Sequence, residues 1–191
     1  MDEPVRAPSP RQSELLELAY QYALRNGLAD LSLRPLAGAI GSSPRVLLFL
    51  FGSKDGLIRA LLARARTDEV ALLERLSHKG RPGDLADVVR TTWQWLVAPE
   101  HRALLVLWAQ AYTRSLTEPD GPWAGFARQT VEDWLAVLAR GQPPDRRRSA
   151  AGATERSLAL AVLRGSLLDL LATDDLDRTT AAVHRHLSES V

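Results

Sequence analysis

The sequence predicts an all-α protein, on two observations. Apolar residues recur at steps of three and four along the segments that lie between glycine- and proline-rich breaks, which is the spacing of one helix face. In addition, residues 32–54 contain two short helical patterns joined by a tight turn and followed at once by another start signal. The chain has 191 residues, of which 46% are hydrophobic, so it can bury a substantial core. This length favours two helical domains of unequal size.

The pattern at residues 32–54 is that of a helix-turn-helix. Ser32 can cap a first short helix, and Gly41 can end that helix in the left-handed conformation that glycine tolerates. Ser43 followed by Pro44 is a second start signal, because proline at the first helical position loses no helical hydrogen bond. The second helix therefore begins after only two residues and must cross the first at a steep angle.

Seven further helices are expected outside this motif. The caps predicted for five of them are Ser9, Ser53, Asp84, Thr154 and Asp177. The expected helices cover about residues 10–26, 54–78, 85–98, 99–112, 123–140, 155–172 and 178 to near the C-terminus. Residues 141–154 hold prolines, glycines and three arginines, and this composition predicts a solvated surface loop in preference to a second nucleic-acid patch.

Composition excludes several classes of protein. The chain has no cysteine, so it forms neither a disulfide nor a thiolate metal site. No glycine-rich phosphate loop, nucleophile motif or carboxylate pair is evident, so we expect no enzyme, no cofactor and no metal site. None of the four histidines pairs with another at the spacing of helical metal ligands; they are His78, His101, His184 and His186.

The ends of the chain and its hydropathy indicate where the protein acts. Residues 1–8 are expected to form a disordered tail without the apolar run of a secretory signal. No uncharged apolar stretch reaches the length that a membrane span requires. We therefore expect a soluble, cytoplasmic protein that does not contact membranes.

Charge is unevenly distributed along the chain. The net charge is +1, but residues 1–66 hold nine Lys or Arg against six Asp or Glu, whereas residues 67–191 hold fifteen against seventeen. The positive excess thus lies on the part that contains the helix-turn-helix. It is modest, so it favours nucleic-acid binding only in combination with that motif.

One predicted helix is apolar on almost every side, which indicates that a second copy of the chain covers part of it. The helix at residues 155–172 needs burial on two faces, and small residues on one of them allow another helix to approach closely. The last helix would complete a four-helix interface. The residues expected in this dimer interface are Ala161, Gly165, Leu168, Val183 and Leu187.

All five tryptophans lie between residues 93 and 134, and this density predicts a cavity for an apolar or aromatic ligand. Ordinary aromatic core is the alternative. Gln94, Gln110 and Arg114 are nearby polar candidates, while Arg164, in an apolar helix, needs an ion pair, a surface position or a ligand. The predicted ligand-binding residues are Trp93, Trp108, Tyr112, Trp134 and Arg164.

From Arg11 to about Leu61 the chain resembles the DNA-binding domain of the TetR family of bacterial transcriptional regulators, and the motif aligns without a gap. The matching residues are Gly27, Ser32, Arg34, Leu36, Ala37, Ala39, Gly41, Ser43, Leu47, Phe49, Phe51, Ser53, Lys54 and Leu57. The resemblance implies a DNA-binding domain at residues 9–54, extending to about residue 62, and a helical ligand-binding and dimerisation domain at residues 63–191. It also implies that the last two long helices form the dimer.

The second helix of the motif, which is the recognition helix in this family, departs from the family pattern at Val46, Leu48 and Leu50. At these positions the family commonly has threonine, tyrosine and histidine. Leu48 and Leu50 are interpreted as core residues, which removes several polar contacts to DNA. Arg34 and Arg45 are the expected base-reading residues and Lys54 the expected phosphate contact. The predicted DNA-binding set is Arg34, Ser42, Ser43, Arg45, Val46, Phe49 and Lys54.

The resemblance implies a repressor that binds an inverted-repeat operator as a homodimer and leaves it when a small apolar ligand binds. The leucines at positions 48 and 50 keep a second hypothesis open. In that hypothesis the chain is a helical ligand-binding or protein-interaction module with weak or lost DNA binding.

Overall fold

The computed structural model describes residues 9–28, 30–79 and 84–189, apart from the side chains of residues 70, 72–79 and 189. Within these ranges the chain is helical without a strand, which confirms the all-α prediction, and no helix in them is long and apolar enough to cross a membrane. The elements are α1 (Pro10–Asn26), α2 (Leu33–Ala39), α3 (Pro44–Phe51), α4 (Lys54–Lys79), α5 (Leu85–Leu96), a 3-10 turn (Pro99–His101), α6 (Arg102–Thr117), α7 (Phe126–Arg140), α8 (Pro144–Arg148), α9 (Ala150–Thr173) and α10 (Leu176–Glu189).

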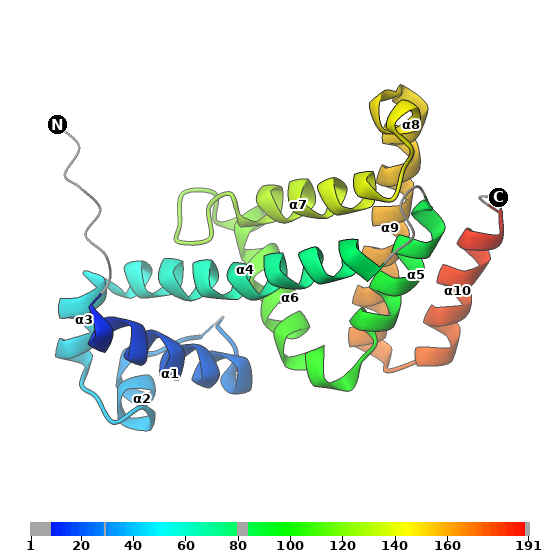
Figure 1. Cartoon of the computed structure of the whole chain (residues 1–191). Coiled ribbons are helices and arrows are strands. Elements are labelled where there is room, and N and C mark those ends of the chain that lie inside the picture. The colour runs from blue at the N-terminus through cyan, green and yellow to red at the C-terminus, as the bar shows by residue number, and fades with distance from the viewer. Residues whose placement is uncertain (1–8, 29, 80–83, 190–191) are drawn as a thin grey trace, which may run out of the picture.

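Helices α1, α2 and α3 form a small bundle around the beginning of α4, at one end of the molecule (Figure 1). Its core contains Leu36 and Ala37 from α2, Leu47 from α3 and Leu57 from α4, all at most 1% exposed. The short helices α2 and α3 each bury only one or two residues, so their stability comes from this shared core more than from their own hydrogen bonds.

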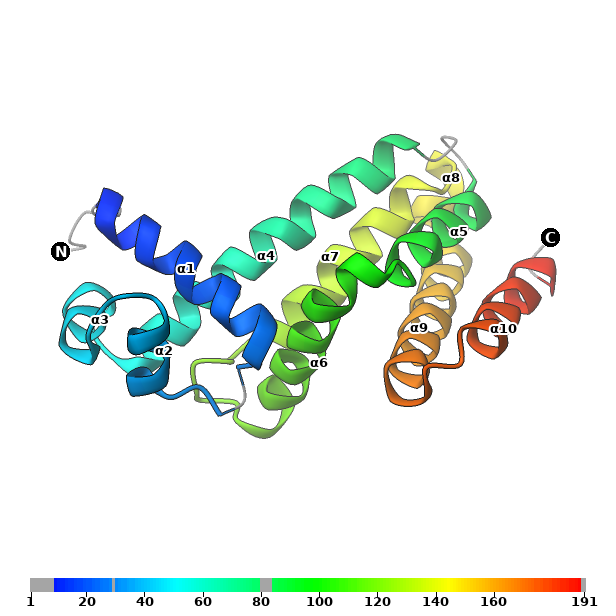
Figure 2. The same cartoon turned by 90° about the horizontal axis from the view of Figure 1, so that it is seen from below.

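Helices α5, α7, α9 and α10 share a second core at the other end of the molecule. Val89, Leu138, Leu163 and Val183 are each at most 1% exposed in this cluster. Figures 1 and 2 both show α9 and α10 side by side, remote from α2 and α3. A bidentate ion pair from Arg178 to the Asp169 carboxylate joins these two helices at their exposed edge.

Helices α4 and α6 connect the two clusters. Leu107 and Ala111 of α6 are buried with the core of the α1–α3 bundle, whereas Leu105 of the same helix is buried in the second core. The side-chain oxygen of Gln110, also on α6, accepts a hydrogen bond from the backbone N–H of Leu28 at 3.0 Å. The loop after α1 is therefore fastened to α6, and α4 is not the sole connection between the ends of the described structure.

Four predicted helix starts are confirmed by capping hydrogen bonds. The side chains of Ser9, Ser43, Ser53 and Asp84 each accept a hydrogen bond from the backbone N–H three residues later. Gly41 has the expected positive φ of 64°. Ser32 is the exception, because its backbone is extended as a cap requires but its hydroxyl accepts no capping bond.

The starts of α9 and α10 differ from the prediction. Ser149 caps α9 by accepting from the Gly152 N–H at 3.0 Å, so the helix begins before Thr154, whose hydroxyl donates to the carbonyl four residues earlier. The alanine-rich turn between them has high helix propensity and extends the helix. Asp175, two residues before the predicted Asp177, accepts from the Arg178 N–H and begins α10.

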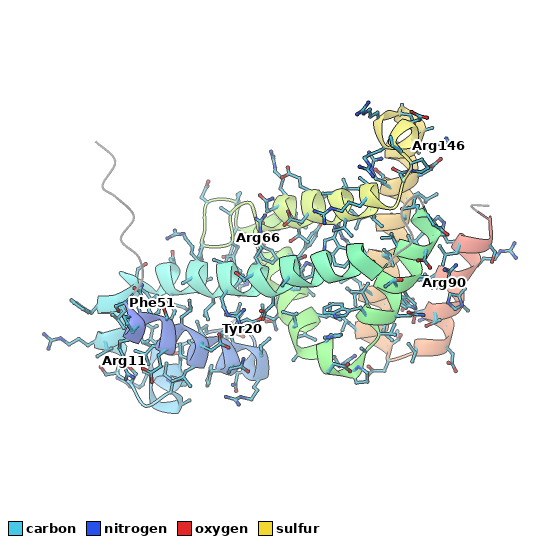
Figure 3. All side chains as sticks on the ribbon, in the orientation of Figure 1. Arg11, Tyr20, Phe51, Arg66, Arg90 and Arg146 are labelled. Atoms are coloured by element: carbon cyan, nitrogen blue, oxygen red, sulfur yellow. The ribbon has the colours of Figure 1, made fainter. Side chains whose placement is uncertain are left out.

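The solvated surface loop predicted for residues 141–154 is wrong in its secondary structure, because these residues contain α8 and the start of α9. Residues 144–148 form α8, since Pro144 occupies a first-turn position and arginine is a good helix former. The turn before it is anchored by Gln142, which is 2% exposed and donates to the Gly152 carbonyl at 3.0 Å. The surface position is correct: residues 143–148 are exposed, and Figure 3 shows Arg146 far from α1–α3.

Two sequence predictions fall outside the described residues. One is the disordered tail at residues 1–8. The other concerns the helix predicted at residues 54–78, whose later turns, from about Val70 to Leu76, we expect to pack against the tryptophan-bearing helices; at residues 70 and 72–76 no side chain is described. The backbone of α4 nevertheless packs on both α5 and α7, so this helix contacts the second cluster directly.

Candidate nucleic-acid interface and buried cavity

The exposed face of α3 is the candidate nucleic-acid interface. Leu47, 1% exposed, fixes the opposite face of the helix in the bundle. The backbone N–H of Ser42 donates to the Ala37 carbonyl at 2.8 Å, which closes the turn between α2 and α3. The Gln12 amide donates to the Leu50 carbonyl at 2.9 Å and ties the C-terminal end of α3 to α1. The helix is thus held at its start, at its end and along one side.

Apolar side chains occupy much of the exposed face of α3. Phe49 is 86% exposed, Leu48 41% and Val46 38%. The interpretation of Leu48 as a core residue is therefore wrong, and Leu50 is only half-buried. A helix as short as α3 can bury only one face, and here that face carries Leu47. An exposed phenylalanine of this size on a surface helix favours a role in contacting a partner.

Three exposed cations lie on α3 and on the helices before and after it in the chain. Arg34 at the start of α2, Arg45 in the first turn of α3 and Lys54 at the start of α4 are all exposed. None of the three forms an ion pair within the described ranges. Their charges are free to meet an anionic partner such as a phosphate backbone.

The two serines predicted to contact DNA differ in position. Ser43 is exposed, and its hydroxyl oxygen accepts the capping bond from the Val46 N–H at 3.3 Å, which leaves its O–H free to donate. The hydroxyl of Ser42 is buried and has no hydrogen-bond partner in the described structure. Of the two, only Ser43 is available at the surface.

A network of charged and phenolic groups fixes α1 on α4. The Tyr20 hydroxyl donates to Asp68 at 2.9 Å, and Arg64 pairs with both Asp68 and Glu17. Burial and the neighbouring Asp68 raise the pKa of Tyr20, so it stays protonated as a donor. Figure 3 shows Tyr20 between the two helices. Because α4 starts directly after α3, this network helps to position the candidate nucleic-acid interface relative to α4.

A largely apolar cavity lies between α4, α5, α6, α7 and α9. Its aromatic walls are Trp95, Trp108, Phe126 and Trp134, and leucines from α5, α6 and α9 complete it. Its volume is ≈ 40 Å³, which is room for a few water molecules. A ring-sized ligand therefore requires the surrounding helices to move apart.

Two charged side chains also line the cavity, Glu69 and Arg164. Glu69 is 8% exposed and accepts a hydrogen bond from the Trp134 indole N–H at 2.7 Å. Burial raises the pKa of Glu69 to about 7, against the lowering effects of that hydrogen bond, Arg66 and Arg164. Glu69 was not among the predicted site residues, although it lies on the buried stripe of α4 that includes Leu62 and Ala65.

The predicted ligand-binding residues are only partly brought together. Trp108, Trp134 and Arg164 line the cavity, and Tyr112 supports Arg164 from outside the lining by accepting a hydrogen bond at 2.9 Å. Trp93 does not line it: this side chain is 2% exposed and its indole N–H donates to the Thr180 hydroxyl at 3.0 Å. Ordinary aromatic core is thus the correct interpretation of Trp93.

The other polar candidates lie elsewhere. Gln94 is exposed, Gln110 binds the backbone after α1, and Arg114 pairs with Glu118. Trp123 belongs to the core of the α1–α3 bundle. Of the polar candidates named from the sequence, Arg164 is the one that lines the cavity.

The cavity shares two residues with the core of the α1–α3 bundle. Ala65 of α4 and Leu107 of α6 line the cavity and also belong to that hydrophobic cluster. A molecule that displaces either side chain must also displace the packing beneath α1. The cavity and the candidate nucleic-acid interface are therefore mechanically connected through α4 and α6.

An exposed stripe of small and apolar residues runs along α9, the α9 stripe, formed by Leu158, Ala161, Gly165 and Leu168. Leu158 is 53% exposed and Leu168 46%. A Cβ atom added at Gly165 would meet nothing within 4 Å, so this side of the helix is open. The stripe contains three of the five residues predicted for a dimer interface.

The other two predicted interface residues, Val183 and Leu187, are 0% and 8% exposed. They belong to this chain's own second core. Their apolar stripe on α10 faces α9 of the same chain, so they cannot present their side chains to a second copy. The sequence pattern could not distinguish a stripe that packs on α9 from one that packs on a partner.

Solved structures provide the comparison with known proteins, since no protein-family model and no curated protein matches the sequence. A putative TetR-family transcriptional regulator from Rhodococcus sp. is 18% identical, with 94% of this chain and 96% of that chain covered and a TM-score of 0.71. A TetR transcriptional regulator from Legionella pneumophila is 16% identical, with 96% and 98% covered and a TM-score of 0.71. Multidrug binding protein EbrR, complexed with proflavin, is 22% identical, with 95% and 99% covered and a TM-score of 0.66.

Proposed function

Because the chain has the all-α fold of the TetR-family transcriptional regulators, we propose that it binds operator DNA as a homodimer and acts as a cytoplasmic repressor. A small apolar or aromatic ligand in the cavity releases it from DNA. The observation that carries this proposal is that Ala65 and Leu107 belong both to the cavity lining and to the core of the bundle that presents α3.

DNA binding is supported by the shape and charge of the surface around α3. A helix of this kind fits the major groove, and a guanidinium such as that of Arg45 can donate two hydrogen bonds to a guanine edge. Arg34 and Lys54 are exposed on the helices before and after α3, and we expect Lys54 to contact a phosphate. The apolar side chains of Val46 and Phe49 can contact thymine methyl groups in the same groove.

The α9 stripe supports a homodimer. Two such stripes packed on each other would bury leucines that are otherwise exposed and would let the helices approach closely at Gly165. A two-fold dimer that places its recognition helices about one DNA turn apart, roughly 34–36 Å, requires an inverted-repeat operator. Gly165→Arg should give monomers, whereas Ala136→Arg, at an exposed position on α7, should leave the dimer intact.

Ligand release follows from the position of the cavity. A ligand larger than the present ≈ 40 Å³ must separate α4, α6 and α9. Since α4 begins next to α3, a tilt of α4 moves the two recognition helices of a dimer out of register with successive major grooves. The structural neighbour EbrR is complexed with proflavin, which supports a small-molecule role for this fold.

The test is binding to DNA from the region upstream of the protein's own gene and of its neighbours. We expect tight binding that weakens steeply between about 50 mM and about 200 mM salt, because each phosphate contact releases a counterion. Gly165→Arg should lose this affinity along with dimerisation. Equal, weak binding to all of these fragments at the lower salt concentration would contradict the proposal.

A second candidate function is a helical ligand-binding or protein-interaction module with weak DNA binding. The 86% exposed Phe49, with Val46 and Leu48 beside it, is the observation that favours it. Under this alternative Phe49→Ala removes binding to a protein partner and leaves DNA affinity unchanged. Under the regulator function Phe49→Ala weakens DNA binding.

A further inference from the structure

Two side chains of the cavity lining carry buried hydrogen-bond donors that have no partner in the described structure. One terminal nitrogen of Arg164, Nη2, and the indole nitrogen of Trp108 are both buried and both lack a hydrogen-bond partner in the described structure. Both belong to side chains that line the cavity, but the surface that these side chains expose to it is apolar, so a ligand reaches the donors only when the walls move apart. Buried polar groups are ordinarily paired, and an unpaired charged donor is the more costly case, so two in one cavity point to a ligand.

The two side chains that carry these donors both pack against the ring of Tyr112. The guanidinium carbon of Arg164 lies 4.9 Å from the centroid of the Tyr112 ring, and the Trp108 ring centroid lies 5.2 Å from it. Arg164 also donates from its other terminal nitrogen, Nη1, to the Tyr112 hydroxyl at 2.9 Å. Tyr112 therefore fixes the guanidinium while leaving Nη2 unpaired, and keeps Trp108 close to it.

Charge decides which ligand suits these donors. Arg164 is a permanent cation. Within the described residues it forms no ion pair with Glu69, the other charged residue of the cavity lining. Glu69 already accepts from Trp134, and burial raises its pKa to about 7, so it carries at most a fraction of a negative charge near neutral pH. The side chains of the cavity lining are thus electropositive on balance, and Nη2 of Arg164 has no acceptor in the described structure.

We propose that the cavity binds an apolar organic anion, whose carboxylate accepts hydrogen bonds from Arg164 and Trp108 while its apolar body lies among the tryptophans. The inference rests on the proposed function in treating the cavity as the ligand site. It adds the chemical class of the ligand. The bidentate shape of a carboxylate suits a guanidinium, and the remaining walls offer only apolar contacts.

Anion binding should be coupled to protonation of Glu69. An anion beside Arg164 repels the ionised form of Glu69, and the groups that already face this carboxyl are Asp133 from α7, Arg66 from α4 and Arg164 from α9. The neutral form is therefore favoured in the complex. Affinity for the anion should rise as the pH falls through about 7, and Glu69→Gln should remove this dependence.

The first test compares three naphthalene derivatives of matched size by calorimetry: 2-naphthoate, neutral 2-naphthamide and the cation 2-naphthylmethylammonium. We expect the full-length dimer to bind the anion about 10- to 100-fold more tightly than the other two, as a hydrogen bond to a charged group predicts. Equal affinities, or tighter binding of the cation, would overturn the proposal.

Two variants identify the donors. Arg164→Met should bring 2-naphthoate to the affinity of 2-naphthamide, while binding of 2-naphthamide itself shows that the cavity remains intact. Trp108→Phe keeps an aromatic wall and removes only the N–H, and should lower the preference for the anion. Arg128→Met, at an exposed position on α7, and Trp95→Phe, another wall residue, are the matched controls. An anion preference that survives Arg164→Met excludes the proposed contact.

The pH dependence tests the coupling to Glu69. Between about pH 8 and about pH 6 the affinity of the wild type for 2-naphthoate should increase by about three- to tenfold, and that of Glu69→Gln should not. His101 stacks on the wall residue Trp95 with ring centroids 3.8 Å apart, so His101→Asn is measured in parallel. A pH dependence that disappears in His101→Asn and persists in Glu69→Gln would overturn the role of Glu69.

These measurements use no DNA, so their failure is distinguishable from failure of the proposed function. If the chain binds operator DNA but shows no preference for 2-naphthoate, only the proposal of an anionic ligand is contradicted. Anion binding without any operator binding contradicts the regulator function and leaves the cavity chemistry standing.

Discussion

The α3 surface and the cavity are built in different ways. The α3 surface comes from about twenty consecutive residues whose caps, turn glycine and buried leucine are all local in sequence. The cavity is assembled from five helices that are distant in sequence, and two of its wall residues also stabilise the α1–α3 bundle. A substitution on the α3 surface should therefore alter one contact at a time. A substitution in the shared wall should alter the packing at both ends of the molecule.

Replacement of Leu107, which the cavity wall shares with the core of the α1–α3 bundle, should have the largest effect on stability. Leu107 is 1% exposed in the core of the α1–α3 bundle and also lines the cavity. Leu107→Ala should lower the free energy of unfolding by about 2–5 kcal/mol, because a buried leucine leaves a cavity behind. Urea denaturation measures it. The control is Val106→Ala, at a residue that is 39% exposed, which should change stability by about 0.5 kcal/mol or less. Equal effects would show that Leu107 is not part of a shared core.

Glu69 should make stability depend on pH. Burial raises its pKa from 4.5 to about 7, so between these values the folded chain binds more protons than the unfolded chain. The free energy of unfolding therefore falls as the pH rises through this window. Glu69→Gln should lack the decline and be more stable than the wild type by up to about 3 kcal/mol near pH 8.

Urea denaturation near pH 5 and near pH 8 measures this difference, and Glu132→Gln, at an exposed position on α7, is the control. If the wild type and Glu69→Gln show parallel pH profiles, the carboxyl of Glu69 titrates normally and the cavity does not desolvate it. The cavity would then be wetter than its walls indicate.

The sequence predicts well the features that depend on neighbouring residues. Ser43, Pro44 and Gly41 determine the turn before α3 through backbone preferences that act over three or four residues, and all three have the predicted roles. Leu48 shows the limit of that reasoning. A continuous apolar run in a helix does not reveal which of its residues are buried, since that depends on where α1 and α4 lie.

The cavity could be predicted only in outline. The density of tryptophans indicated its place in the chain, but Trp93 and Trp123 are in the two cores instead. Glu69 carried a signal, since an acidic residue on the buried stripe of a helix needs a special environment. Its partner Trp134 is 65 residues away, and no local pattern connects them.

Arg45 and Lys54 test whether the α3 surface reads bases one contact at a time. Arg45→Ala should cost about 1–3 kcal/mol at one base pair of the operator and little elsewhere, because a bidentate contact is specific for guanine. Lys54→Ala should weaken binding to all sequences alike and lower the salt slope by about one unit. Fluorescence anisotropy with single-base operator variants separates the two. A uniform loss for Arg45→Ala would make Arg45 a phosphate contact.

The smallest expected effect concerns the apolar part of the same surface. Phe49, 86% exposed, and Val46, 38% exposed, can contact the methyl groups of thymines in the major groove. Replacing one contacted thymine by uracil removes a single methyl group and should cost about 0.8 kcal/mol, or roughly fourfold in affinity.

Scanning each thymine of a half-site in this way locates the contact without altering the protein. In Phe49→Ala the uracil penalty should disappear at the contacted position, because the partner of the methyl group is gone. Leu116→Ala, at another exposed apolar residue on α6, should keep the full penalty. If Phe49→Ala lowers affinity while every uracil penalty persists, Phe49 contacts the sugar–phosphate backbone, and sequence reading depends on Arg34 and Arg45 alone.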